Sequence, residues 1–342
     1  MNYNYFVASA SVLAIRTNAK DFKWSYGIVN QPATEEEYKS CKLRLTVIVE
    51  DINLEVLPDL GKFHYFSGQH GEDTLYYSRN FLFGTKLKIK FENLSTDEPV
   101  IRVNKTYFKY IKHRFMNLHS IHYILTDIAS LLLLNNGFAP IHCSAFKKGD
   151  SVAVIFAPPN SGKTLSAMMA CMELDAEFIA EDLAITDGKN IFSVPGTSTF
   201  RYYDRVSQSA FDNLKNKLTS VIPLFELISF TKPKDIREYT KSICHKAQIT
   251  HSFILERGKE HIHEEEVNEA HRRIVNLNRY EFNYLKSPCL VAYNFYNKEL
   301  GIDKALSTEK ELLLAVLNNS QKIFSLTTRN PLTYAKTIMD LL

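Results

Sequence analysis

The spacing of hydrophobic residues in the first third of the chain predicts β-strands. Apolar side chains occupy every second position from 43 to 49, and residues 87–91, Leu-Lys-Ile-Lys-Phe, repeat the alternation. A period of two places one set of side chains on one face of a strand. Turn-forming stretches such as 67–71 favour short hairpins over long helical crossovers. The pattern therefore predicts a β-rich region from Tyr5 to about Val103, built around an antiparallel sheet.

The hydrophobic period becomes that of a helix after residue 118. Leu118, Ile121, Leu125 and Ile128 fall on one helical face, and Asn135-Asn136-Gly137 supplies a C-terminal stop. The apolar run 152–156 then has the composition of a buried central strand. This change of pattern divides the chain into a β-rich N-terminal region, residues 1–117, and a second domain, residues 118–342.

The second domain continues with segments of several types. Residues 205–280 are charged and are predicted to be largely helical. Segments 290–293 and 323–326 resemble late strands, and helices are expected at 306–318 and 331–342. Within this segment, Glu264-Glu265-Glu266 and Arg272-Arg273 have the charge pattern of an amphipathic helix. The alternative for residues 264–275 is a lid or a peptide-docking arm.

Composition and charge restrict the class of protein. Hydrophobic residues make up 45% of the 342 residues and charged residues 23%, as in globular domains. The net charge of +3 is not gathered into a basic stripe, so a nucleic-acid partner is not expected. The longest apolar run is too short to span a bilayer, so no membrane partner is expected. Five scattered cysteines without a C-x-x-C pair suit a reducing cytoplasm, which is the predicted location.

A phosphate-binding loop is the strongest chemical motif. Residues 157–164, Ala157-Pro158-Pro159-Asn160-Ser161-Gly162-Lys163-Thr164, nearly match the pattern G-x-x-x-x-G-K-[ST] between the predicted strand and an apolar helix. Backbone N–H groups of such a loop converge on phosphate oxygens, while the lysine and the hydroxyl serve the terminal phosphates and Mg²⁺. Ala157 replaces the first glycine, and Asn160 stands where a glycine is frequent, although asparagine tolerates left-handed backbone.

An acidic pair follows this motif. Glu181 and Asp182 lie at the end or in the middle of a second apolar strand, where a charge needs a reason. Asp182 is a candidate ligand of Mg²⁺ and a candidate base for a hydroxyl proton; the alternative is a solvated strand end. Arg201 is a candidate clamp on the γ-phosphate, with a surface ion pair to Asp204 as the alternative. The His261 and His263 pair has a metal-like composition, but on a helix its spacing would point the rings apart.

These residues resemble the HPr kinase/phosphorylase superfamily, a group of P-loop kinases whose core is also similar to that of PEP carboxykinase. The resemblance covers residues 138–205 and rests on four segments: His142-Cys143-Ser144-Ala145, the loop 157–164, the acidic pair 181–182, and Pro195-Gly196 followed by Arg201. It implies an α/β (α+β) fold, a mixed sheet with flanking helices behind the β-rich N-terminal region. It also makes His142, 21 residues before Lys163, the active-site histidine and Asp182 the catalytic carboxylate.

The expected function is therefore transfer of the γ-phosphoryl group of ATP, or another nucleoside triphosphate, to a hydroxyl with the help of Mg²⁺. Glu181 replaces the family's usual first aspartate, and the acidic-Arg-Gly signature of true HPr kinases is missing, which counts against HPr as the substrate and against the reverse phosphorylase reaction. The tailoring kinases of the superfamily, which the chain resembles more closely, imply a serine of a peptide or protein as the acceptor. A sugar or other small alcohol is the alternative acceptor. A nucleotide-binding regulatory module without phosphotransfer is the alternative of another class, a decarboxylating carboxykinase is less favoured, and a homo-oligomer is a further possibility that the family suggests.

Overall fold

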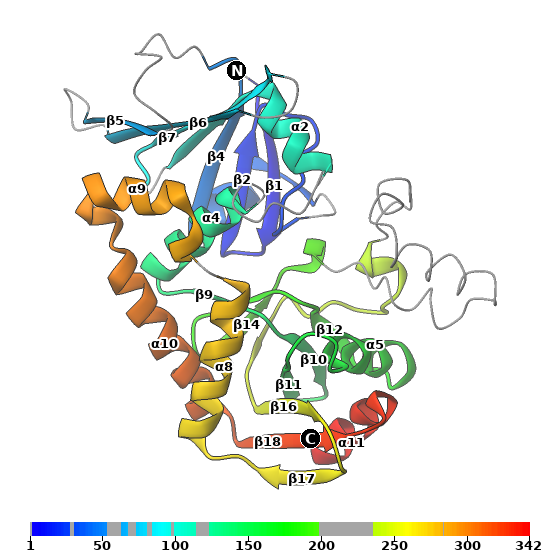
Figure 1. Cartoon of the computed structure of the whole chain (residues 1–342). Helices are drawn as coiled ribbons and strands as arrows, with labels where there is room; N and C mark the ends of the chain where they lie inside the picture. Colours follow the sequence, from blue (N-terminus) through cyan, green and yellow to red (C-terminus); the bar gives the residue numbers. More distant parts are fainter. Residues whose placement is uncertain are drawn as a thin grey trace.

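The computed structural model describes residues 2–27, 31–52, 63–67, 73–80, 84–96, 99–113, 123–197, 235–282 and 284–342. The fold is mixed α/β, and strands in the described residues form three sheets. The first sheet lies at the N-terminal end of the molecule in Figure 1, and the other two lie beyond it toward the C-terminus. The first sheet is built from strands β1 to β8, and the other two sheets are built from strands β9 to β18.

The first sheet has eight strands in the order β3-β1-β2-β4-β8-β7-β6-β5. They are β1 (Asn4–Ser9), β2 (Leu13–Thr17), β3 (Pro32–Ala33), β4 (Leu43–Val49), β5 (Phe63–Ser67), β6 (Asp73–Asn80), β7 (Lys86–Glu92) and β8 (Val100–Val103), with helices α1 (Glu35–Ser40) and α2 (Lys105–His113). The expectation of an antiparallel sheet was wrong in part, since β4 runs parallel to both β2 and β8. Long connections through α1 and through the β5–β7 meander return the chain to the same end of the sheet, which parallel pairing requires.

The second sheet has six strands in the order β12-β10-β11-β16-β18-β17. They are β10 (Ser144–Lys148), β11 (Ser151–Phe156), β12 (Glu177–Ala180), β16 (His251–Arg257), β17 (His261–Glu264) and β18 (Lys322–Thr328). The predicted buried strand is β11, which pairs with β10 on one side and lies parallel to β16 on the other. Its residues 152–156 are all buried because both faces of the strand are covered.

A third sheet of four strands lies against the second, in the order β15-β14-β13-β9. Its strands are β9 (Ala139–Ile141), β13 (Ala184–Thr186), β14 (Asn190–Ser193) and β15 (Lys246–Gln248). The chain therefore leaves the second sheet at Ala180 and enters the third at Ala184. The acidic pair 181–182 lies in this short passage between the two sheets.

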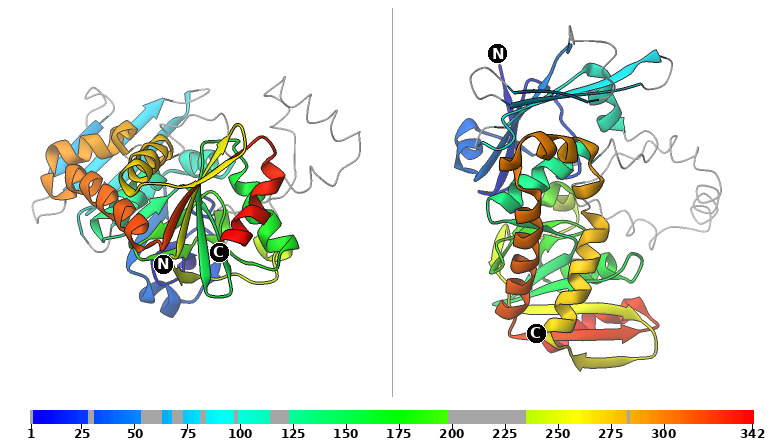
Figure 2. Two further views of the ribbon diagram at one scale, coloured as in Figure 1. Left: turned by 90° about the horizontal axis from the view of Figure 1, so that it is seen from below. Right: turned by 60° about the vertical axis from the view of Figure 1, so that its left-hand side comes forward.

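Helices cover both faces of the second sheet. The helices that follow α2 in the described residues are α4 (Ile124–Asn135), α5 (Lys163–Glu173), α8 (Val267–Glu281), α9 (Pro288–Tyr296), α10 (Ile302–Asn319) and α11 (Tyr334–Leu341), with the short 3-10 helices η2 (Pro195–Thr197), η4 (Ile236–Glu238), η5 (Tyr284–Lys286), η6 (Lys298–Leu300) and η7 (Pro331–Thr333). Helices α5 and α11 pack on one face, while α8, α10 and the third sheet pack on the other. Figure 2 shows α8 and α10 side by side along this second face.

One hydrophobic cluster joins the first sheet to the rest of the molecule. It runs from the inner face of the first sheet through the buried helix α4 to α8, α10 and the third sheet. Helix α4 ends at Asn135 as predicted, and Gly137 adopts the left-handed conformation, with φ +78°, that ends a helix well. The hydroxyl of Tyr293 on α9 also accepts a hydrogen bond from the Leu94 N–H, at 3.2 Å. The two regions therefore share a core.

Two predicted elements were wrong. Segment 290–293 is part of helix α9 and not a strand, because Pro288 at the first helical turn and Ser287 before it are helix-start residues that outweigh a short apolar run. Part of the helix-prone stretch 205–280 forms strands β15, β16 and β17, while only α8 is a long helix in its described part. The apolar run 253–255 within β16 is buried between two strands, and tertiary pairing overrode the charged surroundings.

Candidate functional site

The topology of the second sheet brings three segments that the sequence had singled out to the same end of the sheet, where β11 and β12 finish. Strand β12 is antiparallel to β10, and β10 is antiparallel to β11, so β11 and β12 run in the same direction. This end of the sheet therefore holds the loop after β11, the acidic pair after β12 and His142, which lies just before β10. In open α/β sheets, ligands bind outside the carboxyl ends of the parallel strands.

The loop 157–162 joins β11 to α5 in a conformation that fits its sequence. Asn160 and Gly162 have positive φ angles of 62° and 104°, a left-handed backbone that asparagine tolerates better than most residues. A Cβ atom on Gly162 would lie 2.8 Å from the Cβ of Pro331, so both its backbone and its surroundings require glycine. Ala157 is not among the residues with positive φ, and its methyl group is buried in the core. Its replacement of the first glycine therefore does not disturb the loop.

Lys163 is the first residue of α5, and its side chain is buried. Its Nζ atom has no hydrogen-bond partner in the described part of the chain and lies 3.8 Å from Oδ1 of Asp182. Burial lowers the pKa of this ammonium, and the charge of Asp182 opposes that shift. A buried cation with unused donors at a helix N-terminus is what an anionic ligand requires. Thr164, which follows, is half-buried.

The acidic pair occupies the passage between the second and third sheets. Asp182 has a left-handed backbone, with φ 71°, and its side chain is 64% exposed. Glu181 is buried, and the Leu183 N–H donates to its carbonyl at 2.9 Å. A positive φ is uncommon for residues other than glycine, although aspartate adopts it more readily than most, and residues with such backbone are often found at functional sites. The alternative of a plain solvated strand end explains the exposure of Asp182 but not its ion pair with Lys163.

His142 lies beside this ion pair. Burial lowers the pKa of its imidazole to about 4, with the charge of Lys163 acting in the same direction and Asp182 opposing it. The ring is therefore neutral at pH 7. A neutral imidazole can donate from one ring nitrogen and accept at the other. Its neighbour Cys143 is fully buried, and burial raises the pKa of that thiol to about 12, so it is not a nucleophile.

Two further residues reach the site from the last turn of α8, and sequence reasoning missed both. Burial raises the pKa of Glu281, and the charge of Asp182 adds to this while Lys163 opposes it, so the three charges interact. Asn278, one turn earlier, accepts a hydrogen bond from the His142 N–H at 3.0 Å. Both residues continue the apolar stripe that includes Ala270 and Ile274. Polar side chains on the buried stripe of a helix were the signal that could have identified them.

Other predicted candidates have different outcomes. Arg201 lies outside the described residues, so its role as a clamp stays a prediction. His261 and His263 lie on strand β17 and not on a helix, and their rings stack with centroids 4.9 Å apart. In the described ranges, no group of three or more His, Cys, Asp or Glu side chains is arranged to hold a metal. Mg²⁺ needs no such cluster, because it usually binds to one or two carboxylates together with phosphates.

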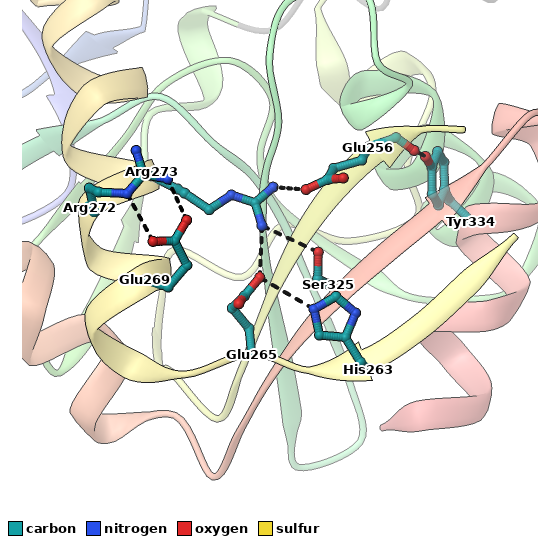
Figure 3. Close-up of polar contacts among 8 residues, drawn as sticks. All are labelled: Glu256, His263, Glu265, Glu269, Arg272, Arg273, Ser325 and Tyr334. Atoms are coloured by element: carbon teal, nitrogen blue, oxygen red, sulfur yellow. Dashed lines mark hydrogen bonds and ion pairs between the residues drawn. The ribbon is translucent and has the colours of Figure 1, made fainter. Parts of the chain in front are cut away.

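The charged stretch before and within α8 forms a cluster around Arg273 (Figure 3). Arg273 bonds to Glu265 Oε2 at 2.7 Å and to the carboxylate of Glu256 on β16, and it contacts Ser325 of β18 at 3.4 Å. Glu264 and Glu265 are not helical, so the predicted helical charge pattern was wrong for them. The cluster instead fastens α8 to the second sheet, which does not favour a mobile lid or docking arm here.

Comparisons with known proteins add no assignment. None of the protein-family models matches the sequence, and no curated protein is significantly similar to it. Among the described residues, every helix is too short or too polar to cross a bilayer.

Proposed function

We propose that this protein is a Mg²⁺-dependent kinase that transfers the γ-phosphoryl group of ATP to the hydroxyl of a serine in a peptide or protein. The proposal includes the P-loop core of the HPr kinase/PEP carboxykinase type. The observation that carries it is Lys163, a buried ammonium at the start of α5 with unused donors and Asp182 3.8 Å away. The mixed six-stranded sheet with helices on both faces supports the core.

Binding of the nucleotide falls to the loop and the helix that follows it. The N-terminal N–H groups of α5 and the Lys163 ammonium attract phosphate oxygens. The Thr164 hydroxyl and the Asp182 carboxylate form a hard oxygen donor set that fits Mg²⁺ when phosphate oxygens and water complete it. The metal would supply neutralisation of the negative charge on the phosphates.

The acceptor side consists of Asp182 and His142. Asp182 is exposed enough to meet an incoming hydroxyl and, as a carboxylate, can take its proton. Because the His142 ring is neutral, it orients the hydroxyl by a hydrogen bond and does not act as a fixed cation. Lys163 then faces the charge that develops on the transferred group. Arg201 retains its proposed role as a clamp.

Phosphate transfer from γ-labelled ATP tests the proposal. The protein is incubated with Mg²⁺ and with cell extract separated into protein, peptide and small-molecule pools. We expect label in the protein or peptide pool, none with Lys163→Met, and at least a 100-fold lower rate with Asp182→Asn at retained ATP binding. Label in the small-molecule pool would replace the serine acceptor by a small alcohol. Tight ATP binding without label in any pool would replace the kinase by a nucleotide-binding regulatory module.

A further inference from the structure

The side-chain amide of Asn278 connects three segments that are distant in sequence. It lies in the last turn of α8 and is only 3% exposed. Its Oδ1 accepts from the His142 N–H at 3.0 Å, and its Nδ2 donates to the Pro140 carbonyl at 3.1 Å and to Glu309 Oε1 at 2.6 Å. The amide orientation follows from its partners, because an N–H can only donate and a carbonyl can only accept. One side chain thus joins β9, α8 and α10.

Asn278 binds β9 as another strand would. Strand β9 is the last strand of the third sheet, and it pairs only with β13 in the described residues. The Pro140 carbonyl and the His142 N–H point away from β13 on the free side of the strand. The amide of Asn278 supplies one acceptor and one donor to these two groups, as a peptide group of a neighbouring strand does. A side chain therefore provides the hydrogen bonds for the free backbone groups of β9 at the point where the chain enters the site.

Packing alone does not require asparagine at this position. The position continues an apolar stripe, where leucine would be nearly isosteric and cheaper to bury. Leucine would, however, leave the buried carbonyl and the N–H without these partners, which is costly. The amide also fixes the turn that carries Glu281, one helical turn further along the same face. Asn278 thus determines where both His142 and Glu281 lie relative to Lys163 and Asp182.

We propose that Asn278 is a positioning residue of the active site, which holds His142 and the last turn of α8 in the arrangement that phosphoryl transfer requires. The inference rests on the proposed kinase function. It concerns the acceptor side of the site, because the hydrogen bonds of Asn278 to Pro140 and His142 do not involve the phosphate-binding loop. Loss of the amide should therefore affect the rate of transfer and leave nucleotide affinity unchanged.

The test compares Asn278→Leu with Asn135→Leu in the full chain. Asn135 is a matched control, because its Nδ2 also joins a helix to a backbone carbonyl, that of Leu300 at 2.8 Å, away from the site. We expect Asn278→Leu to lower kcat by about 10- to 100-fold, the effect of a misplaced catalytic group, with the Kd for ATP unchanged within about twofold. The control variant should transfer phosphate at the wild-type rate. A wild-type kcat in Asn278→Leu would overturn the proposal.

A second pair of variants covers the case in which leucine disturbs the fold. Asn278→Asp keeps the acceptor for His142 but places a carboxylate beside that of Glu309, and it should be slow. Adding Glu309→Gln supplies an amide that can donate to Asp at 278, so the double variant should recover part of the rate. Absence of any recovery, with both variants folded, would count against a positioning role.

Hydrogen exchange separates this inference from the kinase assignment. The His142 amide should be protected in the wild type and should exchange at least about tenfold faster in Asn278→Leu, because its acceptor is gone. A wild-type protein that transfers no phosphate would refute the kinase. An unchanged exchange rate at His142 would refute the anchoring by Asn278, whether or not the wild type is active.

Discussion

Replacing Lys163 by methionine should make the protein more stable while it abolishes nucleotide binding. Lys163 is buried, and its Nζ has no hydrogen-bond partner among the described residues. A structural lysine would lose stability on such a change, whereas a lysine kept for a ligand should gain it. The sign of the effect therefore distinguishes the two roles.

The size of the effect follows from three contributions. An unsatisfied buried polar group costs about 1–3 kcal/mol, and methionine removes it. Methionine has a similar length, so it leaves no large cavity. The lost ion pair joins atoms 3.8 Å apart, with the Asp182 side chain 64% exposed, and contributes about 0–1 kcal/mol. We expect the free energy of unfolding to rise by about 1–2 kcal/mol at pH 7.

The gain should depend on pH in a defined direction. The pKa of Lys163 in the folded protein lies below its ordinary value of 10.5 because of burial. Between these two pKa values, the unfolded chain binds more protons than the folded protein, so wild-type stability rises with pH. The advantage of Lys163→Met should therefore shrink as pH increases toward 10.5.

Urea unfolding followed by far-ultraviolet circular dichroism measures the gain. The only tryptophan, Trp24, lies next to the first sheet, so its fluorescence would report mainly on that part of the molecule. Lys241→Met is the matched control, since Lys241 is 78% exposed and paired with Asp175 at 2.6 Å; its stability should change little. A loss of stability in Lys163→Met, or a difference that does not vary with pH, would refute the reasoning.

Three further predictions follow from other contacts. Gly162→Ala should lower the free energy of unfolding by about 2–4 kcal/mol and weaken ATP binding, because φ is 104° and the new Cβ would lie 2.8 Å from that of Pro331. Urea unfolding and ATP titration measure the two effects, and wild-type values in both would show that alanine fits this position without strain. Arg273→Ala should lower the free energy of unfolding in urea by about 2–3 kcal/mol, because the nearly buried Glu265 side chain keeps, among the described residues, only its contact with His263 at 3.6 Å. A change below about 0.5 kcal/mol would show that the cluster is not stabilising. Burial raises the pKa of Glu309, so wild-type stability should fall as pH rises from 4.5 through that raised pKa. Glu309→Gln should remove this dependence on pH, and equal pH profiles of the two proteins would disprove the prediction.

The sequence predicted the elements whose signals are local. The run 152–156, the loop after it and the stop at Gly137 were all identified correctly, because burial on both faces and left-handed turns leave a mark in consecutive residues. The acidic pair was expected at the end or in the middle of a strand, and it lies directly after the end of β12. Segment 290–293 was misassigned as a strand, since a short apolar run is compatible with both element types.

The site was predicted only in part, because the residues that α8 contributes to it lie far along the chain from the others. Asn278 lies 136 positions after His142, and only the packing of α8 against the third sheet brings them together. The strands 251–257 and 261–264 were missed for a related reason. Their shared pairing partner is β18, whose paired residues lie 71 positions after those of β16 and 60 to 66 positions after those of β17. The charged residues around the two strands resemble an exposed helix.

The position of β11 in the middle of the second sheet has a consequence for protein synthesis. Val152 at its start bonds to Thr250, 98 positions later, and β16 provides its parallel neighbour. At about 5–20 residues per second, an apolar strand edge stays open on the nascent chain for about 5–20 s before its neighbour emerges. The loop 157–162 can make its contacts with Pro331 and Tyr334, which pack against Gly162, only after these residues have also been synthesised. A ribosome-bound intermediate would thus carry the loop 157–162 without the contacts that shape it, and it would expose an apolar strand with one unpaired edge.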